Sequence, residues 1–256
     1  MSQETLFLII TLTLLGAALG SFLMAAFYRI PRGISLWWPP SRCPACDASI
    51  PPWLNIPVFG YLFAKGKCRS CSVPIPCRYP LFELAVAAAY GMLAWQFWSN
   101  SDLLIRAAIF LFFLLACAGV DLFVALDDEE NEGIIPDIFS LGGLVVGLGL
   151  AWWQGRLGIA IPAALVGGGV LLAIYLFYLY VRRIEALGLG DVKMMAMIGA
   201  FSDIPTVFLS IFGGSVLGLV AAGLYMLKLR TFSLQLKIPF GPFLAAGAII
   251  GLLQWQ

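Results

Sequence analysis

Two aspartates stand at the ends of long apolar runs, where a lipid environment would penalise their charge. Asp121 closes one such run, and Asp191 follows another within the stretch Gly188-Leu-Gly-Asp191-Val-Lys193. The chain contains no histidine, which excludes Ser-His and Cys-His nucleophile systems, histidine-ligated zinc hydrolases and imidazole bases. Carboxylates are therefore the leading candidates for proton transfer, because acids at membrane depth are retained mainly for function.

If Asp121 and Asp191 meet in the folded chain, they can act as a pair. Two close carboxylates do not readily ionise together, so one keeps a proton while the other stays charged. The charged acid can activate water, and the protonated acid can polarise a peptide carbonyl. Glycines before Asp191 would let backbone and substrate approach closely. The alternative is that each acid is only a helix cap or an interface residue.

Four cysteines form two pairs, Cys43-Pro-Ala-Cys46 and Cys68-Arg-Ser-Cys71, which are separated by 21 residues. This spacing indicates a four-thiolate zinc knuckle, in which each pair supplies two sulfurs from one turn. Because four thiolates fill a tetrahedral Zn²⁺ ion, the site would be structural. The alternative is ordinary cysteines or disulfides, and disulfides are disfavoured in a reducing cytoplasm. We interpret Cys77 as a spare thiol and Cys117 as part of an apolar core.

The composition indicates a multi-pass membrane protein. The chain is 61% hydrophobic and 11% charged, whereas soluble domains have about 25% charged residues. A net charge of +1 argues against a nucleic-acid partner, because binding phosphates requires a concentrated basic surface. Apolar runs of membrane-spanning length recur along the chain, so the lipid bilayer is the expected surrounding.

The sequence predicts an all-α polytopic membrane protein with about eight transmembrane segments and a small cytoplasmic zinc-knuckle insertion. We divide it into a first transmembrane segment (1–28), a four-cysteine zinc-binding island (29–80) and a membrane-embedded domain (81–256). The piece at 192–201 is short for a span, which needs about 20 residues. The predicted segments are 5–28, 81–98, 103–120, 134–153, 159–181, 192–201, 206–227 and 240–252.

The distribution of basic residues predicts the orientation. Residues 29–78 hold seven lysines and arginines against one acid, Asp47, so this stretch should face the cytoplasm. Alternation along the chain then brings Arg182 and Arg183 to the cytoplasmic side. It also places both Asp121 and Asp191 at the cytoplasmic face, on different helices.

Several stretches in a fixed order resemble the prepilin peptidase family, the bacterial type IV leader peptidases that are intramembrane aspartic proteases. The resemblance extends almost from end to end and includes the two cysteine pairs. The other matching stretches are Gly20-Ser-Phe-Leu23, Tyr28-Arg-Ile-Pro31, Asn55-Ile-Pro-Val58, Arg78-Tyr-Pro-Leu-Phe-Glu83, Ile135-Pro-Asp137, Gly188-Leu-Gly-Asp191-Val-Lys193 and Ile238-Pro-Phe-Gly-Pro-Phe243.

The resemblance implies an enzyme of the bacterial inner membrane that cleaves the leader peptides of type IV prepilins and pseudopilins. Cleavage would use Asp121 and Asp191 at the cytoplasmic face. The resemblance also implies N-methylation of the new amino terminus with S-adenosylmethionine as methyl donor. No residue is assigned to that cofactor, because the chain has no nucleotide-type glycine-rich loop.

Two positions depart from the family pattern. Met24 stands where the family usually has asparagine, which bears on methyl transfer. The interval from Asp121 to Asp137 is longer than in the family and contains the acidic loop 127–132, so Asp127 and Asp128 are alternatives for the first catalytic acid. We interpret that loop as solvated and able to attract a basic leader.

Three alternative functions stay open at this point. The chain could be a peptidase without methyl transfer. It could be an ion-coupled transporter whose acids relay protons, although no internal repeat is evident in the sequence. It could also be a non-catalytic assembly factor that uses the zinc island for docking.

Overall fold

The computed structural model describes residues 3–127, 134–184, 187–229 and 238–255, without the side chains of residues 125–127 and 229. The chain forms two compact units, Met1–Leu104 (unit 1) and Ile105–Gln256 (unit 2). The described residues are helical apart from turns and two isolated β-bridges, so the predicted all-α fold is confirmed. The division at residues 29 and 81 stays a prediction, because the two units reflect packing rather than position relative to a membrane.

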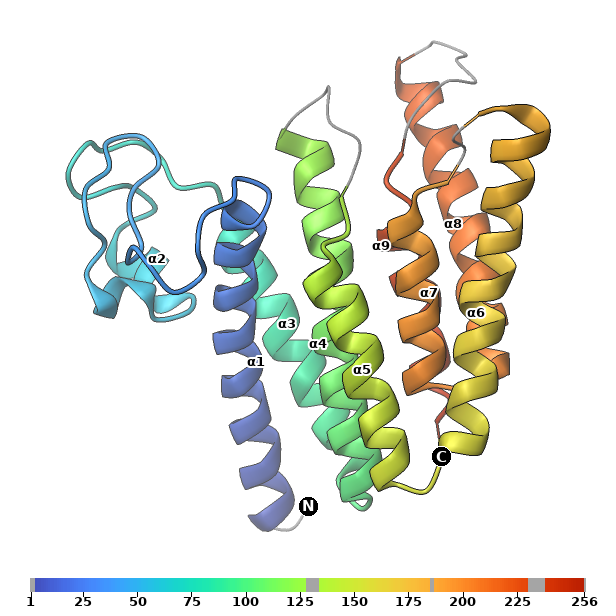
Figure 1. Cartoon of the computed structure of the whole chain (residues 1–256). Coiled ribbons are helices and arrows are strands. Elements are labelled where there is room, and N and C mark those ends of the chain that lie inside the picture. The colour runs from blue at the N-terminus through green and yellow to red at the C-terminus, as the bar shows by residue number, and fades with distance from the viewer. Residues whose placement is uncertain (1–2, 128–133, 185–186, 230–237, 256) are drawn as a thin grey trace. The chain divides into compact units, whose positions relative to one another are not determined.

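Unit 1 is built on two packed helices, α1 (Gln3–Arg29) and α3 (Arg78–Phe97). They lie side by side in Figure 1. Gly16 in α1 permits this close approach, because a Cβ atom added to it would lie only 2.7 Å from Tyr90 Cβ. Leu23, Phe27 and Tyr90 fill the contact with at most 2% of their surface exposed.

The segment between α1 and α3 forms the island, which contains η1 (Pro52–Asn55) and α2 (Phe59–Phe63). It is fastened to α3 through Glu83, whose Oε2 accepts the backbone N–H of Val58 at 2.6 Å. Glu83 is only 8% exposed. Val58 has a φ of 62°, which is unusual for a β-branched residue. The hydrogen bond therefore holds the island backbone in a conformation that valine does not favour.

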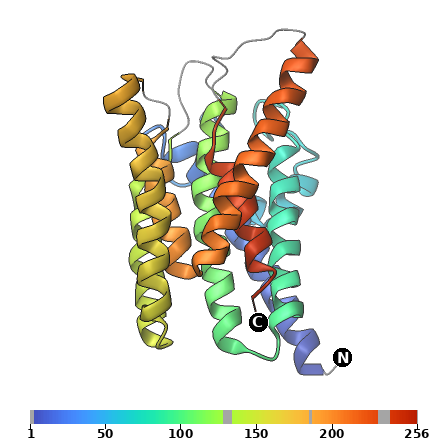
Figure 2. The same ribbon diagram turned by 90° about the vertical axis from the view of Figure 1, so that its right-hand side faces the viewer.

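Unit 2 contains most of α4 (Ser101–Asp127) and the five helices that follow. These are α5 (Asp137–Trp153), α6 (Leu157–Phe177) with its π-helical continuation η2 (Tyr178–Arg182), α7 (Leu189–Phe201), α8 (Ile204–Leu229) and α9 (Gly241–Leu252). Consecutive helices run in opposite directions, as Figures 1 and 2 show. The ends of α4, η2 and α8 and the starts of α5, α7 and α9 thus lie at one end of the unit, called here the aspartate end.

Two helices of unit 2 are short and lie inside it. Helix α7 has 13 residues and packs against α5 and α6, and α9 has 12 residues and packs against α8. Met194, Met197, Leu244 and Ala248 on these helices are fully buried. Because most of their length is buried against other helices, they need not match the thickness of a bilayer.

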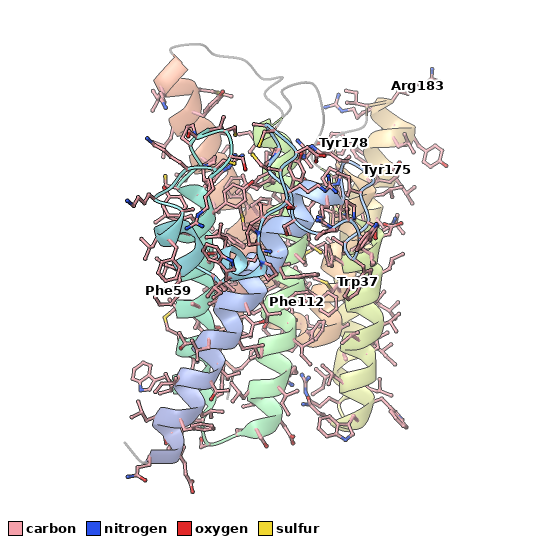
Figure 3. The ribbon with its side chains drawn as sticks, turned by 90° about the vertical axis from the view of Figure 1, so that its left-hand side faces the viewer. Trp37, Phe59, Phe112, Tyr175, Tyr178 and Arg183 are labelled. Carbon is pink, nitrogen blue, oxygen red and sulfur yellow. The ribbon has the colours of Figure 1, made fainter. Side chains whose placement is uncertain are left out.

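Each of the eight predicted apolar segments coincides with a helix, namely α1 and α3–α9. Within the described residues, α1, α4, α8 and α6 with η2 are long and apolar enough to cross a membrane. Tyr175, Tyr178 and Arg183 lie together at the end of the α6–η2 segment (Figure 3). Aromatic and basic side chains of this kind are typical of a membrane–water interface.

Candidate active site

Asp121 lies in α4 near the aspartate end and is 4% exposed. Its Oδ2 accepts the backbone N–H of Gly241 at 3.1 Å. Gly241 is the first residue of α9, so this N–H has no partner within its own helix. The carboxylate of Asp121 in α4 thus accepts a hydrogen bond from the N-terminus of α9, an arrangement that stabilises negative charge.

Asp191 lies in the first turn of α7 and is 8% exposed. Its carboxylate lies close to Gly188, the residue that precedes α7, since a Cβ added there would be 3.6 Å from Oδ2. The charge of Asp121 acts electrostatically on Asp191. The structure therefore brings the two predicted acids to the same end of unit 2, from helices that are far apart in sequence.

Ile135 connects the surroundings of the two acids. Its side chain is 9% exposed and lies beside both Gly190 and Gly241. A Cβ added at Gly190 would be 2.9 Å from Ile135 Cβ, and one added at Gly241 would be 3.2 Å from Ile135 Cδ1 and 2.8 Å from Asp121 Oδ2. The two glycines are thus required by close packing around the acids.

An ion pair joins the start of α5 to α7. Lys193 Nζ lies 2.6 Å from Asp137 Oδ1, and their side chains are 34% and 58% exposed. A pair this exposed contributes about 1 kcal/mol of stability or less. Its main effect is geometric, because it directs Lys193 to Asp137 and fixes α5 relative to the turn that carries Asp191.

The arrangement can support general acid–base chemistry. When two buried acids interact electrostatically, ionisation of one disfavours ionisation of the other, so the pair retains one proton more readily than an isolated acid does. One can then take a proton from water while the other donates one. The approach to Asp191 is open, because Gly188 and Leu189 are exposed.

The alternatives to Asp121 fall at the edge of the described chain. Asp127 is the last residue of α4, and its side chain lies outside the description. Asp128 and the rest of the acidic loop up to residue 132 lie outside the described residues. The identity of the first catalytic acid therefore stays a prediction.

The four paired cysteines of the island form a cluster that could hold a metal ion. The sulfurs of Cys43, Cys46, Cys68 and Cys71 all lie within 4.8 Å of one another. Cys43 and Cys71 are 3.9 Å apart, as are Cys46 and Cys68. Four sulfurs at about 2.3 Å from a tetrahedral Zn²⁺ would be about 3.8 Å apart, so this donor set fits zinc.

Each cysteine pair lies in the same kind of turn. Cys43 N–H donates to Ala48 and Cys68 N–H donates to Val73. The residue after the second cysteine of each pair, Asp47 or Ser72, has a positive φ of 56° or 60°. Two equivalent turns thus face each other and direct their sulfurs into one cluster. Cys77, which precedes α3, is outside this cluster.

Sequence reasoning did not assign roles to Gly241, Ile135 or Lys193. All three belong to motifs that the resemblance singled out, but their contacts join segments that are distant in sequence. The motifs were therefore the available signal, while the N–H donated to Asp121 and the ion pair to Asp137 required the folded chain.

Comparison with known proteins gives consistent matches along the chain. The family model described as the bacterial peptidase A24 N-terminal domain matches residues 14–97, and that of the type IV leader peptidase family matches residues 108–223. A prepilin leader peptidase/N-methyltransferase of Pseudomonas aeruginosa is 32% identical over 99% of this chain and 92% of its own length. A prepilin leader peptidase/N-methyltransferase of Pseudomonas putida is 29% identical over 99% of this chain and 93% of its own length.

A third relative carries a different name. The type 4 prepilin-like proteins leader peptide-processing enzyme of Escherichia coli is 33% identical over 91% of this chain and 89% of its own length. No solved structure matches the chain.

The close packing around Asp121 gives a stability prediction. In Gly241→Ala the added methyl group would meet Asp121 Oδ2 at 2.8 Å, and we expect a loss of about 1–3 kcal/mol from overpacking. Gly149→Ala is the matched control, because nothing lies within 4 Å of its added Cβ. It should be neutral or stabilise α5 by up to about 1 kcal/mol. Thermal unfolding in detergent measures both, and an undiminished melting temperature for Gly241→Ala would contradict the packing described here.

Proposed function

Because the chain belongs to the type IV leader peptidase family, we propose that it cleaves the leader peptides of type IV prepilins and pseudopilins. The observation that carries the proposal is the pair of buried acids, Asp121 and Asp191, in a chain without histidine. The names of the relatives supply the substrate class, since they are prepilin leader peptidases.

In the proposed mechanism the two acids have different roles. The N–H of Gly241 stabilises negative charge on Asp121, so Asp121 is the carboxylate that takes a proton from water. Asp191 carries the shared proton and donates it to the scissile carbonyl, which makes that carbon more electrophilic. Asp121 then gives its proton to the leaving amine as the C–N bond breaks. Asp191 recovers a proton from a hydroxyl of the tetrahedral intermediate, which becomes the new carboxyl group, and the pair returns to its starting state.

The substrate would approach along the start of α7. Gly188 and Leu189 are exposed next to the buried carboxylate of Asp191, so an extended peptide can come close to the backbone there. We place this face in the cytoplasm, as the positive-inside rule favours for the basic island and for Arg182 and Arg183. The acidic residues of 127–132, which follow α4 in the sequence, would then attract a basic leader.

The cysteine cluster is proposed to hold one zinc ion with a structural role. Cys43, Cys46, Cys68 and Cys71 would occupy all four ligand positions. When bound, the ion would cross-link the two turns of the island, and a fully coordinated zinc leaves no position for substrate. The island would then be a rigid attachment on the membrane helices α1 and α3.

Methyl transfer to the new amino terminus is proposed as a second activity, since the relatives are named as N-methyltransferases. The donor would be S-adenosylmethionine, which supplies an electrophilic methyl group. The chain has no nucleotide-type glycine-rich loop, and we assign none of its residues to this cofactor. Met24, at the position where the family usually has asparagine, is 4% exposed and packs into the core of unit 1.

The acid pair gives the central prediction. Asp121→Asn and Asp191→Asn should each lower leader cleavage by about 10³-fold or more, because an amide cannot exchange a proton with water or substrate in these roles. Cleavage of a purified prepilin, followed by the mass of the product, measures this loss. Asp102→Asn is the matched control, since Asp102 is an exposed acid in the first turn of α4, and it should cleave normally.

Two outcomes would contradict these assignments. Full cleavage by Asp121→Asn together with loss in Asp127→Asn or Asp128→Asn would transfer the first role to the acidic loop. Full cleavage by Asp191→Asn would overturn the aspartic mechanism itself.

The metal prediction concerns zinc content. Freshly purified protein should contain about one zinc per chain, and Cys→Ser at any of the four cluster positions should reduce it. Cys77→Ser is the control and should leave the zinc content unchanged, because Cys77 is outside the cluster. Elemental analysis decides the matter, and absence of zinc from unchelated wild-type protein would exclude a zinc knuckle.

Methyl transfer should be separable from cleavage. We expect Asp191→Asn protein to methylate a pre-cleaved pilin at close to the wild-type rate, because transfer to a free amine does not need the acid pair. Mass spectrometry of the pilin detects the added methyl group. A wild-type enzyme that cleaves its substrate and leaves the amino terminus unmethylated would be a dedicated peptidase.

A further inference from the structure

Unit 2 carries two arginines at the end opposite the aspartates. Arg106 lies near the start of α4, and Arg156 immediately precedes α6. The other basic residues of the described part of unit 2 lie at the aspartate end, namely Arg182, Arg183, Lys193 and Lys228. Because basic residues gather on the cytoplasmic side of membrane proteins, a pair at the opposite end requires a local explanation.

Arg106 is a buried cation with incomplete hydrogen bonding. It is 6% exposed, and its Nε has no hydrogen-bond partner in the described chain. Its guanidinium carbon lies 4.2 Å from the centroid of the Trp255 ring, which in turn stacks on Phe110 at 5.5 Å. The face of the Trp255 ring offsets part of the positive charge. It does not accept hydrogen bonds from the N–H groups, which point outward in the plane of the guanidinium.

Arg156 is also short of acceptors. One of its nitrogens donates to the carbonyl of Ser202 over a long 3.4 Å, and Nη1 is buried without a partner in the described chain. The charges of Arg106 and Arg156 repel each other, and Asp203 attracts both. Asp203 already accepts the N–H of Thr206 at 3.0 Å to cap α8. Among the described residues, two cations therefore face one acid that is already partly engaged.

The depth of this cluster matches the headgroup region of a bilayer. Helix α6 has 21 residues and spans roughly 30 Å, the thickness of the hydrocarbon core. Tyr178 and Arg183 mark its far end. At the near end, Trp152 and Trp153 are 74% and 62% exposed just before Arg156, as expected for anchors at the second interface.

We propose that Arg106 and Arg156 form a binding site for a phosphate-type oxyanion, with the phosphodiester of an anionic phospholipid as its ligand. Guanidinium groups match phosphate oxygens through paired N–H donors. The free N–H groups at the start of α6 add positive potential beside Arg156. The ligand would balance positive charge of the two arginines and hold the α5–α6 and α7–α8 connections together.

The test is native mass spectrometry of the full-length protein in detergent, titrated with phosphatidylglycerol. Arg156→Gln should weaken binding of the lipid about tenfold, because it removes a charge-assisted hydrogen bond. Asp203→Asn should strengthen binding, since the amide oxygen still caps α8 while the competing negative charge is lost. Arg182→Gln, an exposed arginine at the aspartate end, is the matched control and should bind as wild type does. Leader cleavage by Arg156→Gln should stay at the wild-type level.

Two further ligands distinguish the source of the oxyanion. Diacylglycerol, which lacks the phosphate, should not bind at the site. Displacement of phosphatidylglycerol by millimolar inorganic phosphate would show that a free phosphate occupies the same site, whereas resistance to it assigns the site to the lipid. The proposal is overturned if folded Arg156→Gln binds phosphatidylglycerol as tightly as wild type, if Arg182→Gln weakens binding equally, or if diacylglycerol binds as well as the phospholipid.

Discussion

A carboxylate withdrawn from water needs a hydrogen-bond donor or a shared proton, and this requirement governs the aspartate end of unit 2. Asp121 meets it through the N–H of Gly241 at the start of α9. Asp191 lies in the first turn of α7, where backbone N–H groups favour negative charge, and the proposed proton shared with Asp121 would remove the repulsion between the two acids. Ile135 fills the remaining space and contacts Gly190 and Gly241. Any side chain at either glycine would separate the groups that compensate the buried acids.

The same requirement explains why the acids lie on short or terminal parts of helices. A helix that begins inside the protein presents unpaired N–H groups there, and only an enclosed helix can do so without exposing them to lipid. Helices α7 and α9 are enclosed, with Met194, Met197, Leu244 and Ala248 fully buried. The start of α9 lies against Asp121, and Asp191 lies in the first turn of α7. Both acids are thus served by the first turn of a short helix.

The island obeys a different constraint, because it has little apolar core of its own. Its short elements are held by the cysteine cluster and by the bond from Val58 to Glu83 on α3. A metal in the cluster would supply cross-links that burial does not provide. This division of roles agrees with the separate family matches of residues 14–97 and 108–223.

The sequence by itself determined the helical segments, the cysteine pairs and the two candidate acids, because apolar runs, Cys-x-x-Cys spacing and isolated intramembrane acids are local patterns. It also indicated the family through motifs whose order is preserved. Only the tertiary structure decided that Gly241 donates to Asp121, that Lys193 pairs with Asp137, and that Arg106 and Arg156 share one charged cluster. These contacts join helices distant in sequence, and they depend on helix packing, which follows from the complementary shapes of whole faces rather than from any one stretch of residues.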